Sequence, residues 1–177
     1  MLAILSYEAL DTGLPARFVS FRSHLPTSAS HAEGKGLKRA GVLWNNYGYH
    51  LWLIADYSGA RAAYERALKI DPEGATLVNN LGAVFQNLGD FHSAHVMYER
   101  ALKIDMAAYG QDHPNVARDI NNIGDLMRMQ DNFVDARKMY ERALTIFEKQ
   151  LGENHPNVAM VLNNMGGVMR MQGELVG

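Results

Sequence analysis

One short motif recurs along this chain and restricts its fold more than any other feature. The tetrapeptide Asn-Asn-apolar-Gly occurs four times, at spacings of 34, 42 and 42 residues. Its copies are Asn45–Gly48, Asn79–Gly82, Asn121–Gly124 and Asn163–Gly166. The pentapeptide Tyr-Glu-Arg-Ala-Leu begins at Tyr64, Tyr98 and Tyr140, in register with the first series. Two motifs that recur in register indicate an array of structural repeats.

Each repeat has the pattern of two helices joined by a short turn. In the first repeat, Trp44 and Leu51 lie on one apolar stripe, which predicts a helix over about 42–54. Small or polar residues at 55–57 favour a tight turn, and a second apolar stripe follows around Tyr64. The glycine that ends each tetrapeptide removes side-chain bulk where the two helices cross. The helix pairs are therefore expected to pack closely and to stack on one another.

These residues resemble the pattern of the tetratricopeptide repeat family, in which Trp, Leu-Gly, Tyr, Ala, Phe and Pro stand at fixed intervals. The first repeat matches this pattern at Trp44, Tyr47, Gly48, Leu51, Ala60, Tyr64 and Pro72. The resemblance covers residues 41–177 and implies an all-α fold, a right-handed α-solenoid of antiparallel helix pairs. The repeats are expected at about 41–74, 75–116 and 117–158, with a half repeat at 159–177.

The two 42-residue repeats resemble a longer form of this family, found in kinesin light chains and in the repeat tails of bacterial signalling NTPases. Their eight extra residues are followed by His-Pro-Asn-Val-Ala, which begins at His113 and His155. The resemblance implies that the insert lengthens the second helix by about two turns, and that His-Pro opens the next helix. The two histidines are therefore expected to cap helix starts.

Residues 1–40 differ in character from the repeats. They contain prolines, glycines and a cluster of Ser, Thr and His residues, with five basic and three acidic residues. Apart from a short helix at Met1–Leu10, no helical or strand period is sustained, so we expect a mostly irregular or disordered segment. The apolar start lacks a basic region and Glu8 follows quickly, which argues against a signal peptide.

Composition and motifs exclude several classes of function. The net charge of −2 gives no support to a nucleic-acid or anionic-membrane surface, and no apolar stretch approaches the ~20 residues of a membrane span. The absence of cysteine excludes disulfides and thiolate zinc sites, and it fits a cytoplasmic protein. The chain contains no Gly-x-Ser-x-Gly, His-Glu-x-x-His or phosphate-binding loop, so we expect neither an enzyme nor a cofactor. His92 and His95 lack a third ligand, so no metal site is expected.

The Asn-Asn pairs mark the candidate binding surface. The family resemblance implies that the first helices of the repeats line a concave groove, where the family binds peptides or partner helices. The first asparagines of the pairs would form a ladder along this groove, at Asn45, Asn79, Asn121 and Asn163. An amide offers both a donor and an acceptor, so it can hold a peptide backbone of any sequence. The alternative role is structural, with each asparagine bonded to a neighbouring helix and fixing the repeat spacing.

Charged residues are expected on the same surface. Arg118, Arg128 and Arg170 are suited to pair with acidic residues or a terminal carboxylate of a ligand, and Asp125 lies one turn from Asn121. Salt bridges within the protein are the alternative role of the arginines. We therefore predict a protein-interaction scaffold that binds a peptide or a partner helix in the groove. The alternative function is a regulatory or sensor repeat tail, or a fragment, of a larger signalling NTPase.

The fourth repeat has only its first helix before the sequence ends. Its apolar residues Leu162, Met165 and Met169 then lack their usual cover, although end repeats of solenoids usually have polar outer faces. Three explanations are open: a fragment, a truncated gene product, or a protein that self-associates through the uncovered half repeat.

Overall fold

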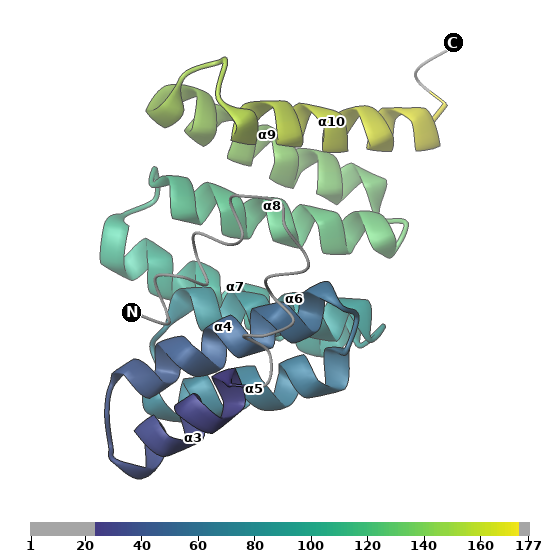
Figure 1. Cartoon of the computed structure of the whole chain (residues 1–177). Coiled ribbons are helices and arrows are strands. Elements are labelled where there is room, and N and C mark those ends of the chain that lie inside the picture. The colour runs from purple at the N-terminus through teal and green to yellow at the C-terminus, as the bar shows by residue number, and fades with distance from the viewer. Residues whose placement is uncertain (1–23, 174–177) are drawn as a thin grey trace. The chain divides into compact units, whose positions relative to one another are not determined.

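The computed structural model describes residues 24–173, which form eight α-helices and no β-strand (Figure 1). The helices are α3 (Leu25–Gly34), α4 (Arg39–Leu53), α5 (Tyr57–Ile70), α6 (Ala75–Asn87), α7 (Phe91–Tyr109), α8 (Pro114–Met129), α9 (Phe133–Leu151) and α10 (Pro156–Met171). The predicted all-α fold of paired helices is confirmed. Residues 1–23, with the predicted helix at Met1–Leu10, and residues 174–177 lie outside the described part of the chain.

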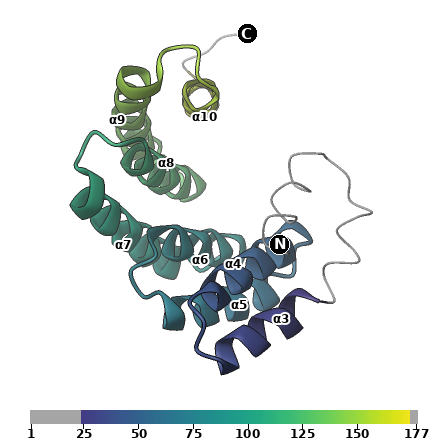
Figure 2. The same ribbon diagram turned by 60° about the vertical axis from the view of Figure 1, so that its left-hand side comes forward.

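The helices belong to two compact units, which comprise residues 1–89 and 90–177. In the first unit, α4 and α5 form a closely packed pair, α3 packs against α4, and α6 packs against α5. The second unit repeats this arrangement. Its closely packed pair is α8 and α9, α7 packs against α8, and α10 packs against α9. Figure 2 shows α10 nearly end-on beside α9.

In each closely packed pair, one glycine of the first helix lets the two helices approach one another. A Cβ atom on Gly48 would lie 2.8 Å from Cε1 of Tyr64, and one on Gly124 would lie 2.8 Å from Cε1 of Tyr140. Both tyrosines are buried. The ring therefore fills the space that the missing side chain leaves, and the crossing reaches the packing density of a protein interior. This confirms the predicted role of the glycine for Gly48 and Gly124.

The predicted turns end in N-caps. The side chains of Asp56, Asp90 and Asn132 each accept a hydrogen bond from the backbone N–H three residues later, at 3.0, 3.0 and 3.4 Å. Such a bond satisfies one of the free donors at a helix start. The residue before two of these caps, Ala55 and Asp131, has a φ of +60°, so the chain turns sharply into the next helix.

The eight extra residues of the long repeats are divided between two helices. Helices α7 and α9 have 19 residues each and α5 has 14, so the second helix gains about one and a half turns. Helix α8 has 16 residues and α6 has 13, so the remainder extends the start of the next first helix. The connections stay short, at 71–74, 110–113 and 152–155. The lengthening of the second helix is thus somewhat less than the expected two turns.

The prediction of an irregular segment over residues 1–40 is wrong for Leu25–Gly34, which form α3. This helix packs against α4 through a stripe of buried residues, Leu25, Ala29 and Ala32. Pro26 lies in the first turn, where its missing N–H is tolerated. The indole Nε1 of Trp44 donates to Glu33 at 2.9 Å and ties the two helices together. The stripe is short and lies among Ser, Thr and His residues, which conceals its period in the sequence.

Candidate functional site

The asparagine pairs join consecutive repeats. In the first unit, Nδ2 of Asn80 donates to Oδ1 of Asn45 at 3.0 Å. In the second unit, Nδ2 of Asn164 donates to Oδ1 of Asn121 at 3.2 Å. In both cases the second asparagine of one repeat binds the first asparagine of the repeat before it. These bonds correspond to the structural role that the sequence left open as an alternative.

Burial separates the four first asparagines into two kinds. Asn79 is 8% exposed and Asn121 is 2% exposed, and Nδ2 of Asn121 also donates to Asp125 at 3.3 Å. These two residues have little surface to offer a ligand. Asn45 is half-buried and Asn163 is exposed. A binding role for the asparagines stays a prediction, and the structure leaves only Asn45 and Asn163 accessible for it.

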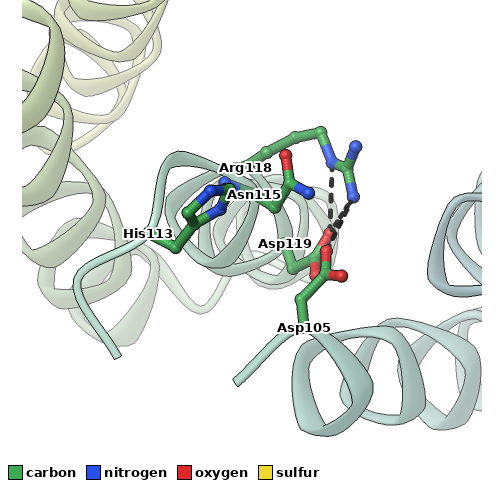
Figure 3. Close-up of polar contacts among 5 residues, drawn as sticks. All are labelled: Asp105, His113, Asn115, Arg118 and Asp119. Atoms are coloured by element: carbon green, nitrogen blue, oxygen red, sulfur yellow. Dashed lines mark hydrogen bonds and ion pairs between the residues drawn. The ribbon is translucent and has the colours of Figure 1, made fainter. Parts of the chain in front are cut away.

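Arg118 forms ion pairs with two buried aspartates (Figure 3). Its Nη2 lies 3.2 Å from Oδ2 of Asp105 and 3.0 Å from Oδ1 of Asp119, and its Nε donates to the same Asp119 oxygen at 3.2 Å. Asp105 belongs to α7 and is 3% exposed, whereas Asp119 belongs to α8 and is fully buried. The guanidinium thus holds two helices together, which is the alternative role given above for Arg118. We refer to these three residues as the Asp–Arg–Asp cluster.

This cluster was not predicted from sequence, although the aligned repeats contain a signal for it. The positions equivalent to Asp119 in the other repeats are apolar: Leu43, Leu77 and Val161. Asp105 corresponds to Phe147, which is fully buried in the next repeat. Charges therefore join α7 to α8, where apolar side chains join α9 to α10. Oδ2 of Asp119 accepts no hydrogen bond from any residue in the described range, which is uncommon for a buried carboxylate.

The cluster predicts a pH dependence of stability. Burial raises the pKa of Asp119 to about 7, because Arg118 offsets only part of the desolvation and Asp105 adds to it. An aspartate in the unfolded chain has a pKa of about 4. Below a pH of about 4, the carboxyl of Asp119 is protonated in both the folded and the unfolded chain. At higher pH the unfolded chain releases this proton first, while the folded chain keeps it. The stabilisation of the folded chain by the bound proton is therefore lost as the pH rises through about 7.

We expect the urea midpoint of the wild-type chain to fall between about pH 5 and pH 8 relative to that of Asp119→Asn. The amide of this variant has the shape of the protonated carboxyl and does not titrate. Circular dichroism at a series of pH values measures both midpoints. Parallel curves for the two proteins would contradict the assignment of the titration to Asp119.

Asp125 and Arg128 form a second ion pair, further along α8. Nη2 of Arg128 lies 3.6 Å from Oδ1 of Asp125, and the hydroxyl of Tyr140 donates to the same oxygen at 2.8 Å. Burial raises the pKa of Asp125, and the hydrogen bond from Tyr140 is the largest effect that opposes it. The carboxylate therefore joins α8 to α9, while Arg128 stays partly accessible at its outer side.

Arg170 differs from the other two predicted arginines. It is exposed and forms no ion pair with any residue between 24 and 173. The position that corresponds to Asp125 in the fourth repeat is Gly167, so the carboxylate that would pair with this arginine is missing. Of the three predicted arginines, Arg170 has the cation most available to a ligand.

An aromatic pocket lies in the first unit, lined mainly by the first helices α4 and α6. Its volume is about 120 Å³, and it is lined by Tyr49, Trp52, Tyr64, Asn80 and Ala83. The rings of Tyr49 and Trp52 stack with their centroids 6.0 Å apart. Ala83 occupies the position in the second repeat that Tyr49 occupies in the first. Its small side chain leaves space beside the two rings. This pocket was not predicted from sequence, because its lining comes from two repeats and Tyr49, Trp52 and Ala83 lie outside the repeated motifs.

The histidines of the long repeats cap helices, as predicted. Nδ1 of His113 accepts from the backbone N–H of Asn115 at 3.2 Å, and Nδ1 of His155 accepts from that of Asn157 at 3.1 Å. Within residues 24–173 there is no group of three His, Asp or Glu side chains that could hold a metal ion. The same part of the chain has no helix that is long and apolar enough to cross a membrane.

Comparison with protein families gives two matches. The profile described as Tetratricopeptide repeat matches residues 74–149 and 120–175, and that described as TPR repeat matches residues 56–89. No protein with curated function matches the chain.

Similar folds occur among solved structures. The chain is similar to BtubC (BKLC) from P. vanneervenii, with 24% identity and a TM-score of 0.80, over 98% of this chain and 72% of that one. It is also similar to the N-terminal domain of stress-induced protein-1 (STI-1) from C. elegans, with 20% identity and a TM-score of 0.56, over 72% and 95% of the two chains. A third similar structure is the first TPR of Spaghetti (RPAP3) bound to HSP90 peptide SRMEEVD. The identity is 16% and the TM-score is 0.58, over 75% of this chain and 93% of that one.

Proposed function

Because this chain belongs to the tetratricopeptide repeat family, we propose that it is a non-catalytic scaffold that binds a peptide or a partner helix on the faces of its first helices. The aromatic pocket of the first unit carries this proposal. Its lining comes from two consecutive repeats, from the first helices α4 and α6 together with Tyr64 of α5.

The size and chemistry of the pocket favour a side chain of a protein ligand. Pockets for small molecules have volumes of roughly 300–1,000 Å³, whereas this pocket has about 120 Å³. The rings of Tyr49 and Trp52 offer apolar surface to an aromatic or aliphatic group. Asn80 also lines the pocket; its Nδ2 donates to Asn45, and its amide oxygen can accept a hydrogen bond from a ligand backbone.

The second unit, taken by itself, offers cations to an acidic group of a ligand. Arg170 is exposed, and Arg128 is 36% exposed in spite of its contact with Asp125. A guanidinium binds a carboxylate through two parallel hydrogen bonds. A chain terminus or an acidic side chain would therefore contact this unit. The peptide-bound form of Spaghetti (RPAP3) supports a peptide ligand for a fold of this kind.

The test is a selection of random peptides displayed on phage, followed by calorimetry with synthetic versions of the enriched sequences. We expect peptides with an apolar anchor residue. Trp52→Ala should weaken their binding at least tenfold, because one wall of the pocket is lost. The matched control is Val134→Ala, which truncates an exposed side chain on second helix α9 and should leave the affinity unchanged. Circular dichroism verifies that both variants fold.

Equal affinities of Trp52→Ala and wild type would overturn the assignment of the ligand to the aromatic pocket. Retention of binding by Trp52→Ala together with its loss in Arg170→Glu would move the site to the second unit. A failure to select any peptide from a large library would contradict a scaffold for short linear ligands.

A further inference from the structure

The Asp–Arg–Asp cluster buries more negative than positive charge. It contains two carboxyl groups, those of Asp105 on α7 and Asp119 on α8, and the single guanidinium of Arg118. The two aspartates are 3% and 0% exposed. With both of them ionised, two negative charges and one positive charge would leave a net charge of −1 in a place that water does not reach. A buried charge without a partner is costly, so the cluster is expected to bind one proton.

One oxygen of Asp119 is suited to hold this proton. Its Oδ1 accepts two hydrogen bonds from Arg118, at 3.2 and 3.0 Å. Its Oδ2 is buried and accepts no hydrogen bond from the described residues, although buried carboxylate oxygens normally have a partner. A proton on Oδ2 removes the excess charge and leaves the contacts between Oδ1 and Arg118 in place.

The groups that act on Asp119 all belong to the cluster. Helices α7, α9 and α10 pack against α8. Desolvation raises the pKa of Asp119 and Asp105 of α7 raises it further, whereas Arg118 lowers it. No other charged group in the described part of these helices contributes. The nearby His113 accepts from the backbone N–H of Asn115 and makes no bond to the cluster (Figure 3).

The next junction of the array has the same construction without charges. Helices α7 and α9 both have 19 residues, and each is followed by a connection of four residues, at 110–113 and 152–155. Both connections begin with a glycine of positive φ, at +85° and +87°. Phe147 and Val161, which are fully buried, stand where the first junction has Asp105 and Asp119. The second unit therefore contains two junctions of the same form, and only one of them can bind a proton.

We propose that the junction of α7 and α8 is a pH-sensitive joint, which is closed while the Asp–Arg–Asp cluster holds a proton and opens locally when the proton is lost. Asp105 lies in the last turns of α7, and Asp119 lies in the second turn of α8. Separation of these turns lets water reach both carboxylates and screen their excess charge. Such local openings cost less free energy than global unfolding, so the joint can respond while the rest of the unit stays folded.

The direction of the response follows from the protons bound in the two forms. In the open joint the carboxyl of Asp119 is hydrated, and its pKa is about 4, as in an unfolded chain. In the closed joint the pKa is raised to about 7. The closed form is therefore stabilised at low pH, and this stabilisation is lost as the pH rises from about 4 to about 7. Above that range no further change is expected.

The test is amide hydrogen exchange of the full wild-type chain, followed by mass spectrometry at a series of pH values. Each rate is divided by the intrinsic exchange rate at the same pH, which gives a protection factor. We expect the protection of residues 101–120, around the cluster, to fall at least about tenfold between about pH 5 and pH 8. Residues 143–162 are the same positions of the next junction, and their protection should change less than about twofold.

Two variants test whether the excess charge is the cause. Asp105→Asn and Asp119→Asn each leave one carboxylate for the guanidinium of Arg118, so either substitution should abolish the fall in protection. Asp112→Asn is the matched control, because this aspartate lies in the same connection but is 59% exposed and pairs with Lys149 at the surface. The fall should persist in this variant. Circular dichroism verifies that each variant folds.

Three results would overturn the inference. The first is a wild-type protection factor around the cluster that does not depend on pH. The second is an equal fall at both junctions, because this would show a change in the stability of the whole unit rather than a local joint. The third is a fall that persists in either folded Asn variant of the cluster. If one of these variants does not fold, the other variant and the comparison of the two wild-type junctions still decide.

Discussion

Arg118→Ala is expected to lower the free energy of unfolding by about 3 kcal/mol. The substitution leaves Asp105 and Asp119 facing each other, 3% and 0% exposed, without a cation. A buried charge that loses its partner typically costs 3–5 kcal/mol, and we expect the lower end because the Arg118 side chain is 32% exposed. Denaturation with urea, followed by circular dichroism, measures the change.

The next repeat supplies the control. The double substitution Asp105→Phe with Asp119→Val introduces the residues that join α9 to α10, Phe147 and Val161. Replacement of a buried ionic cluster by apolar residues is often neutral or stabilising, by about 1–4 kcal/mol. In this background, Arg118→Ala should cost less than about 1 kcal/mol. An equal cost of Arg118→Ala in both backgrounds would show that the arginine stabilises the protein by packing alone.

Tyr140→Ala is expected to cost about 4 kcal/mol of unfolding free energy, which is typical of deleting a buried aromatic ring. The ring is fully buried and fills the recess at Gly124. Its hydroxyl also donates to Asp125, so Tyr140→Phe, which keeps the ring, should cost about 2 kcal/mol, as for other hydrogen bonds to charged groups. The same denaturation experiment separates the two contributions.

The control for this series is Val134→Ala on the same helix. Val134 is 58% exposed, and a surface truncation of this kind should change stability by less than about 0.5 kcal/mol. If Tyr140→Ala and Tyr140→Phe had the same effect, the hydroxyl alone would account for the contribution, and the proposed fit between ring and glycine would be wrong.

The repeat pattern was sufficient to predict most of the fold. The spacing of the Asn-Asn-apolar-Gly motif located the first helices, and the Ala and Tyr positions located the second helices. The cap function of His113 and His155 also followed from sequence, because it depends on local geometry. The helix Leu25–Gly34 did not follow, because its stability comes from packing against α4 rather than from a strong period of its own.

The candidate site was less predictable, because the roles of its residues depend on contacts between helices. An asparagine or arginine on a first helix has the same local pattern whether it faces a ligand or a neighbouring repeat. Only the three-dimensional contacts show that Asn121 and Arg118 bind within the protein. The aromatic pocket depends in the same way on two helices, since Tyr49 and Ala83 meet only after the repeats stack.

The asparagine bonds have a consequence for how such an array could change in length. At each bonded junction, the earlier repeat contributes the acceptor through its first asparagine, which is Asn45 or Asn121. The later repeat contributes the donor through its second asparagine, which is Asn80 or Asn164. The connection is therefore directional but identical in chemistry at both observed junctions, and it carries no charge. A repeat gained by duplication of its coding segment, or lost by deletion, would leave complementary groups on the repeats that become neighbours.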